Sequence, residues 1–211
     1  MRPNTIDIDV ADASLTGFDS NITGAGPWTM TTTATTDGLA HQISLRNDSS
    51  TDYSGQTFTA VGTDADGNAL SEAITGPTGS ATVESSGYFK TLTTITASGA
   101  GISTDTFDVG WVDEVASKTY PIDRMSDYQC NIQVDVTGTI DFTVQELWAN
   151  VYDYAKPQQT GPWLNISALA AKTADTASQA TRGATAIRIL INSYSSEAEL
   201  QVYTTQPATS L

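Results

Sequence analysis

The sequence predicts an all-β protein made of two β-sandwich domains of jelly-roll or immunoglobulin-like type, with little helix. Apolar residues alternate with polar ones in short runs, the period-two pattern of strands that are buried on one face. Gly, Asn and Asp separate these runs at intervals of about 8–12 residues, as in sandwiches and barrels. Threonine is the commonest amino acid in this chain of 211 residues, and its β-branched polar side chain suits the solvent face of a pleated strand.

The strand pattern recurs along the whole chain. Near the start, Ile6 and Ile8 alternate with aspartates, and Ile43 and Leu45 alternate with polar residues. Later runs either alternate in the same way or are rich in β-branched and aromatic residues, and they cover residues 57–61, 88–95, 132–136, 140–144, 186–191 and 200–203. Helical periodicity is weak, because the one Ala-rich stretch, 167–172, is short and is followed by threonines.

Turn signals divide these runs. Residues 62–69 place Asp, Gly and Asn where a positive φ is favourable, which predicts a hairpin connection. Residues 136–140 predict a second, tighter hairpin with Gly138 at its tip. Residues 75–79 predict a loop, because Pro77 cannot sit in a central strand.

Charge divides the chain near residue 115. Residues 1–115 hold 15 acids and 3 bases, and residues 116–211 hold 9 acids and 6 bases, so the net charges are −12 and −3. The segment Asp113–Pro121 lies between these regimes and shows no strand pattern. We therefore predict a linker between domains 1–115 and 116–211. The alternative is one continuous sandwich in which this segment is a long crossover.

Composition excludes several classes of protein. One cysteine cannot form an internal disulfide, and one histidine cannot build a histidine-rich metal site. A net charge of −15 repels phosphate backbones, so nucleic acid is not an expected partner. No apolar run approaches the length of a membrane helix, so no membrane partner is expected. The first twenty residues lack an apolar core, which predicts no secretory signal peptide and synthesis in a cytoplasm.

The acidic turn after residue 63 offers the best metal candidate. Asp64, Asp66 and Asn68 carry oxygen ligands, and Glu72 follows. A helix-flanked calcium loop needs glycine at its sixth position and glutamate at its twelfth. Here Gly67 is fourth and Glu72 ninth, and the flanks are strand-like. A hairpin turn is the preferred interpretation, with a weak surface Ca²⁺ site as the alternative.

Nothing in the sequence marks an enzyme or calls for a cofactor. His41 is interpreted as a half-exposed strand histidine without a catalytic partner. Cys130 shares strand phase with apolar positions and is interpreted as a buried, inert thiol. A hydrolase with two paired carboxylates has the least support among the alternatives. Of the four tryptophans, Trp163 follows Pro162 in a predicted loop and is the best candidate for an exposed aromatic contact, for example with a sugar.

Several runs resemble a module that is common in structural proteins of tailed bacteriophages. The runs that resemble this module are residues 37–43, 54–64, 71–77 and 88–93. A later segment is similar to one that is often found beside the module, and it comprises residues 134–145, 162–163 and 185–189. These motifs are strand-and-turn patterns and carry no functional residues. The resemblance implies a virion component that is made in a bacterial host.

Such a protein is expected to be a non-enzymatic homo-oligomer that binds its own copies and other virion proteins, such as major capsid, portal, adaptor or tail proteins. Capsid decoration as a cement protein is preferred, with a tail, connector or fibre-attachment position as one alternative. A carbohydrate-binding host-attachment module is the alternative from another class. The less acidic half is expected to dock through four cationic residues, Lys156, Lys172, Arg182 and Arg188.

Overall fold

The chain folds into two compact units, each with its own core. The structure, a computed structural model, describes residues 2–24, 26–99, 102, 105–122, 129–148 and 162–206. We call Ala11–Asp113 the N-terminal sandwich, and Met1–Val10 together with Glu114–Leu211 the C-terminal sandwich. Strands dominate both units, and the described helical structure is a 3₁₀ turn at Ser167–Leu169. The predicted all-β sandwich class is confirmed.

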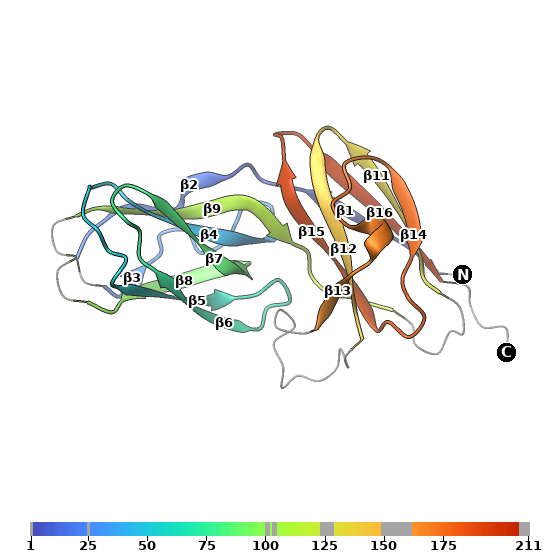
Figure 1. The fold of residues 1–211 in the computed structure, drawn as a ribbon, viewed down its shortest axis with the longest axis horizontal. Coiled ribbons are helices and arrows are strands. Elements are labelled where there is room, and N and C mark those ends of the chain that lie inside the picture. Colours follow the sequence, from blue (N-terminus) through green and yellow to red (C-terminus); the bar gives the residue numbers. More distant parts are fainter. Residues whose placement is uncertain are drawn as a thin grey trace. The chain divides into compact units, whose positions relative to one another are not determined.

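The N-terminal sandwich is formed by a four-stranded sheet and by four strands of an eight-stranded sheet (Figure 1). One sheet has the order β2, β9, β4, β7, and the other has the order β3, β8, β5, β6. Their bounds are β2 (Ser14–Ile22), β3 (Trp28–Thr29), β4 (Ala40–Asn47), β5 (Thr57–Thr63), β6 (Ala69–Thr75), β7 (Thr82–Phe89), β8 (Thr91–Ala97) and β9 (Phe107–Ala116). The β5–β6 pairing through Thr63 and Ala69 confirms the hairpin predicted at residues 62–69.

Aromatic rings fill the core between these two sheets. The ring centre of Phe107 lies 5.1 Å from that of Trp28, 5.4 Å from that of Phe58 and 5.1 Å from that of Tyr53. Phe107 belongs to one sheet, whereas Trp28 and Phe58 belong to the other. Tilted aromatic contacts at such distances stabilise a core beyond the area that they bury. This cluster therefore holds the two sheets face to face.

Glu72 joins the open edges of the two sheets in the N-terminal sandwich. It lies on edge strand β6, and its two carboxylate oxygens accept hydrogen bonds of 2.7 Å from the backbone amides of Ser86 and Gly87 on edge strand β7. An unpaired strand edge invites association with other chains. The carboxylate satisfies two such edge donors within the domain.

We expect Glu72→Gln to lower the free energy of unfolding of the N-terminal sandwich by about 1–3 kcal/mol, because one backbone amide keeps only a neutral acceptor and the other faces the glutamine NH2 donor. Urea unfolding followed by the fluorescence of the buried Trp28 and Trp111 measures the loss. Glu84→Gln, at an exposed position of β7, is the matched control. Equal stability of the two variants would contradict this role for Glu72.

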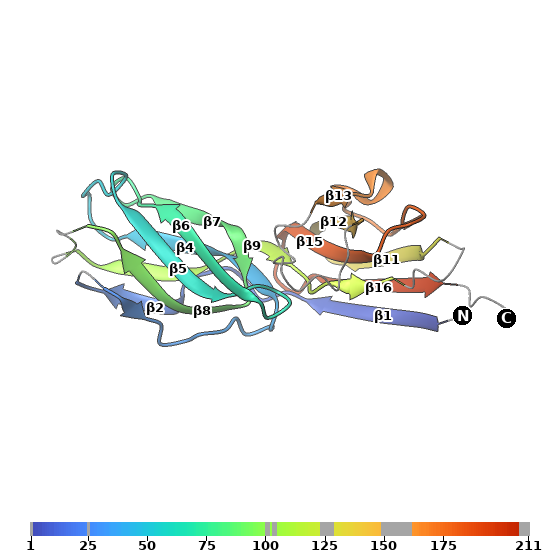
Figure 2. The same cartoon turned by 90° about the horizontal axis from the view of Figure 1, so that it is seen from below.

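The C-terminal sandwich pairs a sheet of order β1, β16, β11, β14 with the strands β13, β12 and β15 of the eight-stranded sheet. Figure 2 shows β1 alongside β16. The bounds are β1 (Arg2–Asp9), β10 (Tyr120–Pro121), β11 (Asn131–Thr137), β12 (Ile140–Leu147), β13 (Trp163–Asn165), β14 (Thr176–Gln179), β15 (Ala186–Tyr194) and β16 (Glu199–Gln206). Branched aliphatic side chains from both sheets form its core, together with Phe142.

The first strand belongs to a different unit from the one predicted. β1 pairs with β16 over eight residues, from Arg2 opposite Gln206 to Asp9 opposite Glu199. Ile6 and Ile8 are 4% and 3% exposed within the C-terminal sandwich. The predicted domain 1–115 is therefore wrong for residues 1–10. Edge pairing explains the difference, because β16 needs a partner on the side that β11 leaves open.

The predicted linker Asp113–Pro121 is partly strand. β9 continues to Ala116, and Val115 and Ala116 pair with Ile191 and Leu190 of β15. Tyr120 and Pro121 form the short strand β10, which also pairs with β15. The polar, half-buried Asp113 and Glu114 interrupt the apolar alternation in the middle of β9. This interruption explains why the sequence pattern suggests a linker.

The predicted hairpin at residues 136–140 is also wrong. β11 pairs with β14 and β16, whereas β12 pairs with β13 and β15. The chain thus crosses from one sheet of the C-terminal sandwich to the other at this point. Gly138 has a φ of +81°, a conformation that costs glycine little and that other residues rarely adopt. The glycine signal was therefore a true turn signal, but the turn joins two sheets.

Candidate functional site

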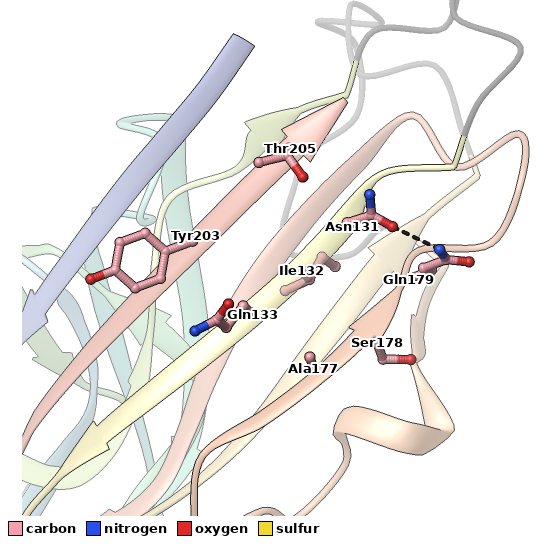
Figure 3. A pocket seen from close by; sticks show the side chains of 8 residues that line it. All are labelled: Asn131, Ile132, Gln133, Ala177, Ser178, Gln179, Tyr203 and Thr205. Carbon is pink, nitrogen blue, oxygen red and sulfur yellow. Dashed lines mark hydrogen bonds between the residues drawn. The ribbon is translucent and has the colours of Figure 1, made fainter. Parts of the chain in front are cut away.

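A polar hollow lies on the outer face of the sheet formed by β14, β11 and β16 (Figure 3). Its cavity volume is about 580 Å³. The register of the three strands builds it as two rows. Gln179, Asn131 and Thr205 form the first row, and Ala177, Gln133 and Tyr203 form the second. Ile132 and Ser178 complete the lining.

Hydrogen bonds between neighbouring side chains hold the hollow in shape. The Gln179 Nε2 group donates to Asn131 Oδ1 at 2.7 Å, as drawn in Figure 3. The Gln133 Nε2 group donates to Asp135 Oδ1 at 2.9 Å, and the Tyr203 hydroxyl donates to Gln201 Oε1 at 2.8 Å. All eight lining residues are uncharged. The hollow therefore offers fixed, neutral hydrogen-bonding groups beside one aromatic ring.

Trp163 and Arg188 meet on the outer face of the other sheet of the C-terminal sandwich. The Arg188 guanidinium carbon lies 4.5 Å from the centre of the Trp163 ring, within range of a cation–π contact. Arg188 Nε also donates to Gln145 Oε1 at 2.8 Å, and Gln145 Nε2 donates to Asn165 Oδ1 at 2.7 Å. The predicted contact residues Trp163 and Arg188 thus lie together, and both interact with neighbouring residues of the same sheet.

The other predicted docking cations do not join this pair. Lys172 forms an isolated antiparallel β-bridge with Phe142, and the Phe142 side chain lies in the core. Arg188, in contrast, is paired with Gln145 on the outer face. Side chains of paired residues share one face of a sheet, so Lys172 and Arg188 lie on opposite faces. Arg182 is exposed in the turn before β15. Lys156 lies outside the described residues. One continuous cationic docking face is therefore not formed by the described members.

The best exposed tryptophan is not the predicted one. Trp148 is 49% exposed, whereas Trp163 is half-buried against Leu147 and Ala186. Trp28 and Trp111 are core residues, as large aromatic residues in a sandwich usually are. The Trp148 indole N–H donates to Glu146 Oε1 at 3.1 Å, and this bond holds the ring at the end of β12. Trp163 is less exposed because it pairs with Leu147 of β12 and is covered by Arg188 on the outer face of the sheet.

The calcium candidate is a hairpin turn. Asp64 is buried, and its Oδ1 atom accepts hydrogen bonds of 2.9 Å from the backbone amides of both Asp66 and Asn68. The Asn68 side-chain amide adds a contact of 3.2 Å to Oδ2. The carboxylate thus satisfies the donors of the turn. Within the described ranges, no group of three or more His, Cys, Asp or Glu side chains is placed to hold a metal ion.

His41 differs from the expected half-exposed histidine, because it is fully buried and paired. Its Nε2 atom lies 2.8 Å from Asp37 Oδ2, and its Nδ1 atom lies 2.9 Å from the Val112 carbonyl oxygen. Asp37 also accepts from the backbone amides of Ala11 and Leu39, both at 2.9 Å. The pair therefore ties together the first residues and the last residues of the N-terminal sandwich.

The pKa of the Asp37 carboxyl reflects this pairing. Burial alone would raise it, but the hydrogen bond from His41 and those from the Ala11 and Leu39 amides outweigh burial, so the pKa is lowered.

Cys130 behaves as expected for a buried thiol, since it is 4% exposed and burial raises its pKa to about 11. A thiol with that pKa is almost wholly protonated at neutral pH and is a poor nucleophile.

Comparison with known proteins adds no family to this description. No protein-family model matches the chain, and a search of the curated proteins finds no matching relative. Among the residues that the structure describes, no helix is long and apolar enough to span a bilayer.

Proposed function

We propose that the chain is a non-enzymatic structural subunit of a tailed-bacteriophage virion, present in several symmetric copies and most consistent with a capsid decoration (cement) protein. The resemblance of its strand-and-turn runs to a phage structural module motivates the proposal. One structural observation supports it most: the chain builds two separately cored sandwiches and crosses between them twice, at Val10–Ala11 and at Asp113–Glu114. Rigid modules that present large outer faces suit repeated contacts in a symmetric assembly.

Charge suggests which sandwich docks. With the boundaries that the structure gives, the N-terminal sandwich holds twelve acids and two bases, net −10, and the C-terminal sandwich holds twelve acids and seven bases, net −5. The asymmetry is smaller than the boundary at residue 115 suggests, because β1 brings Asp7 and Asp9 to the C-terminal side. The less acidic unit also carries exposed Trp148 and Leu164. We place the docking contacts on the C-terminal sandwich.

A tail, connector or fibre-attachment position is the second candidate within the same class, since a two-domain chain can dock with one unit and project the other. Copy number separates the two positions. We expect quantitative mass spectrometry of purified particles to find on the order of hundreds of copies for a decoration protein, and about six or twelve for a tail protein. Absence of the chain from purified particles would overturn the proposal.

A further inference from the structure

We propose that the hollow on the β14–β11–β16 face is a binding site for a neutral glycan chain. The inference goes beyond the structural role above, and it concerns a property of the isolated protein. It does not use Trp163, because that ring is packed beneath Arg188. Three features of the hollow suit such a ligand, namely its hydrogen-bonding groups, its charge and its shape.

The hydrogen-bonding groups suit hydroxyls. The Oδ1 atom of Asn131 accepts a hydrogen bond from Gln179 Nε2. The Nδ2 group of Asn131 can therefore donate to another partner, and the Oε1 atom of Gln179 can accept from one. Gln133 likewise donates through Nε2 to Asp135 and retains its Oε1 acceptor. Sites with both amide donors and amide acceptors match ligands whose groups both donate and accept. A sugar hydroxyl does so at every position around the ring.

Charge argues against anionic ligands. The lining is neutral, and the carboxylate of Asp135, at its border, already accepts from Gln133. The C-terminal sandwich has a net charge of −5, so anionic ligands such as phosphorylated, sulfated or sialylated chains approach against the field. A neutral glycan pays no such cost.

Shape gives the ligand a place to lie. Ala177 pairs with Gln133 on one side while Tyr203 pairs with it on the other, so a small side chain faces a large one across the central strand. The volume of about 580 Å³ is within the roughly 300–1,000 Å³ that is typical of ligand sites. The half-buried Tyr203 ring offers an apolar face to the C–H groups of a sugar and a polar tip to its hydroxyls.

The test uses the full chain on an array of unmodified oligosaccharides of glucose, galactose, mannose and N-acetylglucosamine, with sulfated and sialylated versions as charged comparators. Isothermal titration calorimetry then measures the affinity of each hit. We expect binding to neutral glycans in the micromolar to millimolar range. Tyr203→Ala and Gln133→Ala should each weaken it at least about ten-fold, since each removes a group that contacts the ligand.

Gln42→Ala and Tyr88→Ala are the matched controls. They remove the same two side chains from a register pair on β4 and β7 of the N-terminal sandwich, and affinity should be unchanged. Gln133 is exposed, so its variant should fold even if Tyr203→Ala does not. Three results would overturn the proposal: no neutral glycan bound at millimolar concentration, binding that folded Gln133→Ala leaves intact, or a hollow occupied by a second copy, seen as a concentration-dependent dimer that Gln133→Ala disrupts.

Discussion

The double variant Ile6→Ala/Ile8→Ala is expected to unfold the C-terminal sandwich and to leave the N-terminal sandwich folded. Both side chains are almost fully buried, and each truncation costs about 2–5 kcal/mol in a well-packed core. The positions lie two residues apart on one strand, so their effects are not strictly additive. Their combined cost is still a large part of the roughly 5–15 kcal/mol that stabilises a typical domain.

Hydrogen exchange followed by mass spectrometry locates the loss. Amide protection should fall in β16, the strand next to β1, and in β11, which pairs with β16, while β5 and β8 keep their protection. The control Thr5→Ala/Asp7→Ala changes exposed positions of the same strand and should shift stability by no more than about 0.5 kcal/mol per site. Loss of protection in β5 and β8, with β11 and β16 unaffected, would mean that β1 belongs to the N-terminal sandwich after all.

The second large effect is expected at the His41–Asp37 pair. Asp37→Ala removes the acceptor for His41 Nε2 and for the Ala11 and Leu39 amides. Breaking a buried pair by removing one partner costs about 3–5 kcal/mol, because the remaining polar group is left without compensation. We expect a loss of this size in the N-terminal sandwich, measured by urea unfolding at pH 7. Asp37→Asn retains a side-chain oxygen and should lose less.

The same pair predicts a pH dependence. The pKa of Asp37 is lower in the folded chain than in an unfolded chain, where it is near 3.9. The folded state therefore binds fewer protons over this range, and stability is lost as the pH falls through the folded pKa. The difference in stability between the natural chain and Asp37→Asn should shrink as the pH falls below about 4. A difference that grows on acidification would contradict the assignment.

Local patterns in the sequence were sufficient for most strands but not for their partners. Alternation at Ile132 and Val134, and at Phe142 and Val144, predicts β11 and β12 because period-two burial is a local property. The pairing of β1 with β16 joins residues about two hundred positions apart, and no local signal specifies it. The same limit applies at Gly138. The glycine predicts a turn, but it does not indicate which sheet the next strand joins.

The site could be predicted less well than the fold. Asn131 and Gln133 could be placed on an outer face from the alternation in β11, but Ala177 and Tyr203 join them only through the register of three strands. Thr176–Gln179 shows weak strand character after an Ala-rich stretch, so β14 itself was not expected. His41 and Asp37 are only four residues apart, but their polar partners are distant in the sequence. His41 contacts the carbonyl oxygen of Val112, near the end of the N-terminal sandwich, and Asp37 accepts from the amide of Ala11, at its start.

The proposed structural role is tested most directly by electron cryomicroscopy of the particles that contain the chain. We expect density for both sandwiches, repeated on the symmetry of the head or of the tail, with the C-terminal sandwich making most of the contacts with neighbouring proteins. A reconstruction in which neither head nor tail has density that fits the two sandwiches would contradict the structural role. Contacts made mainly by the N-terminal sandwich would contradict the assignment of the docking unit.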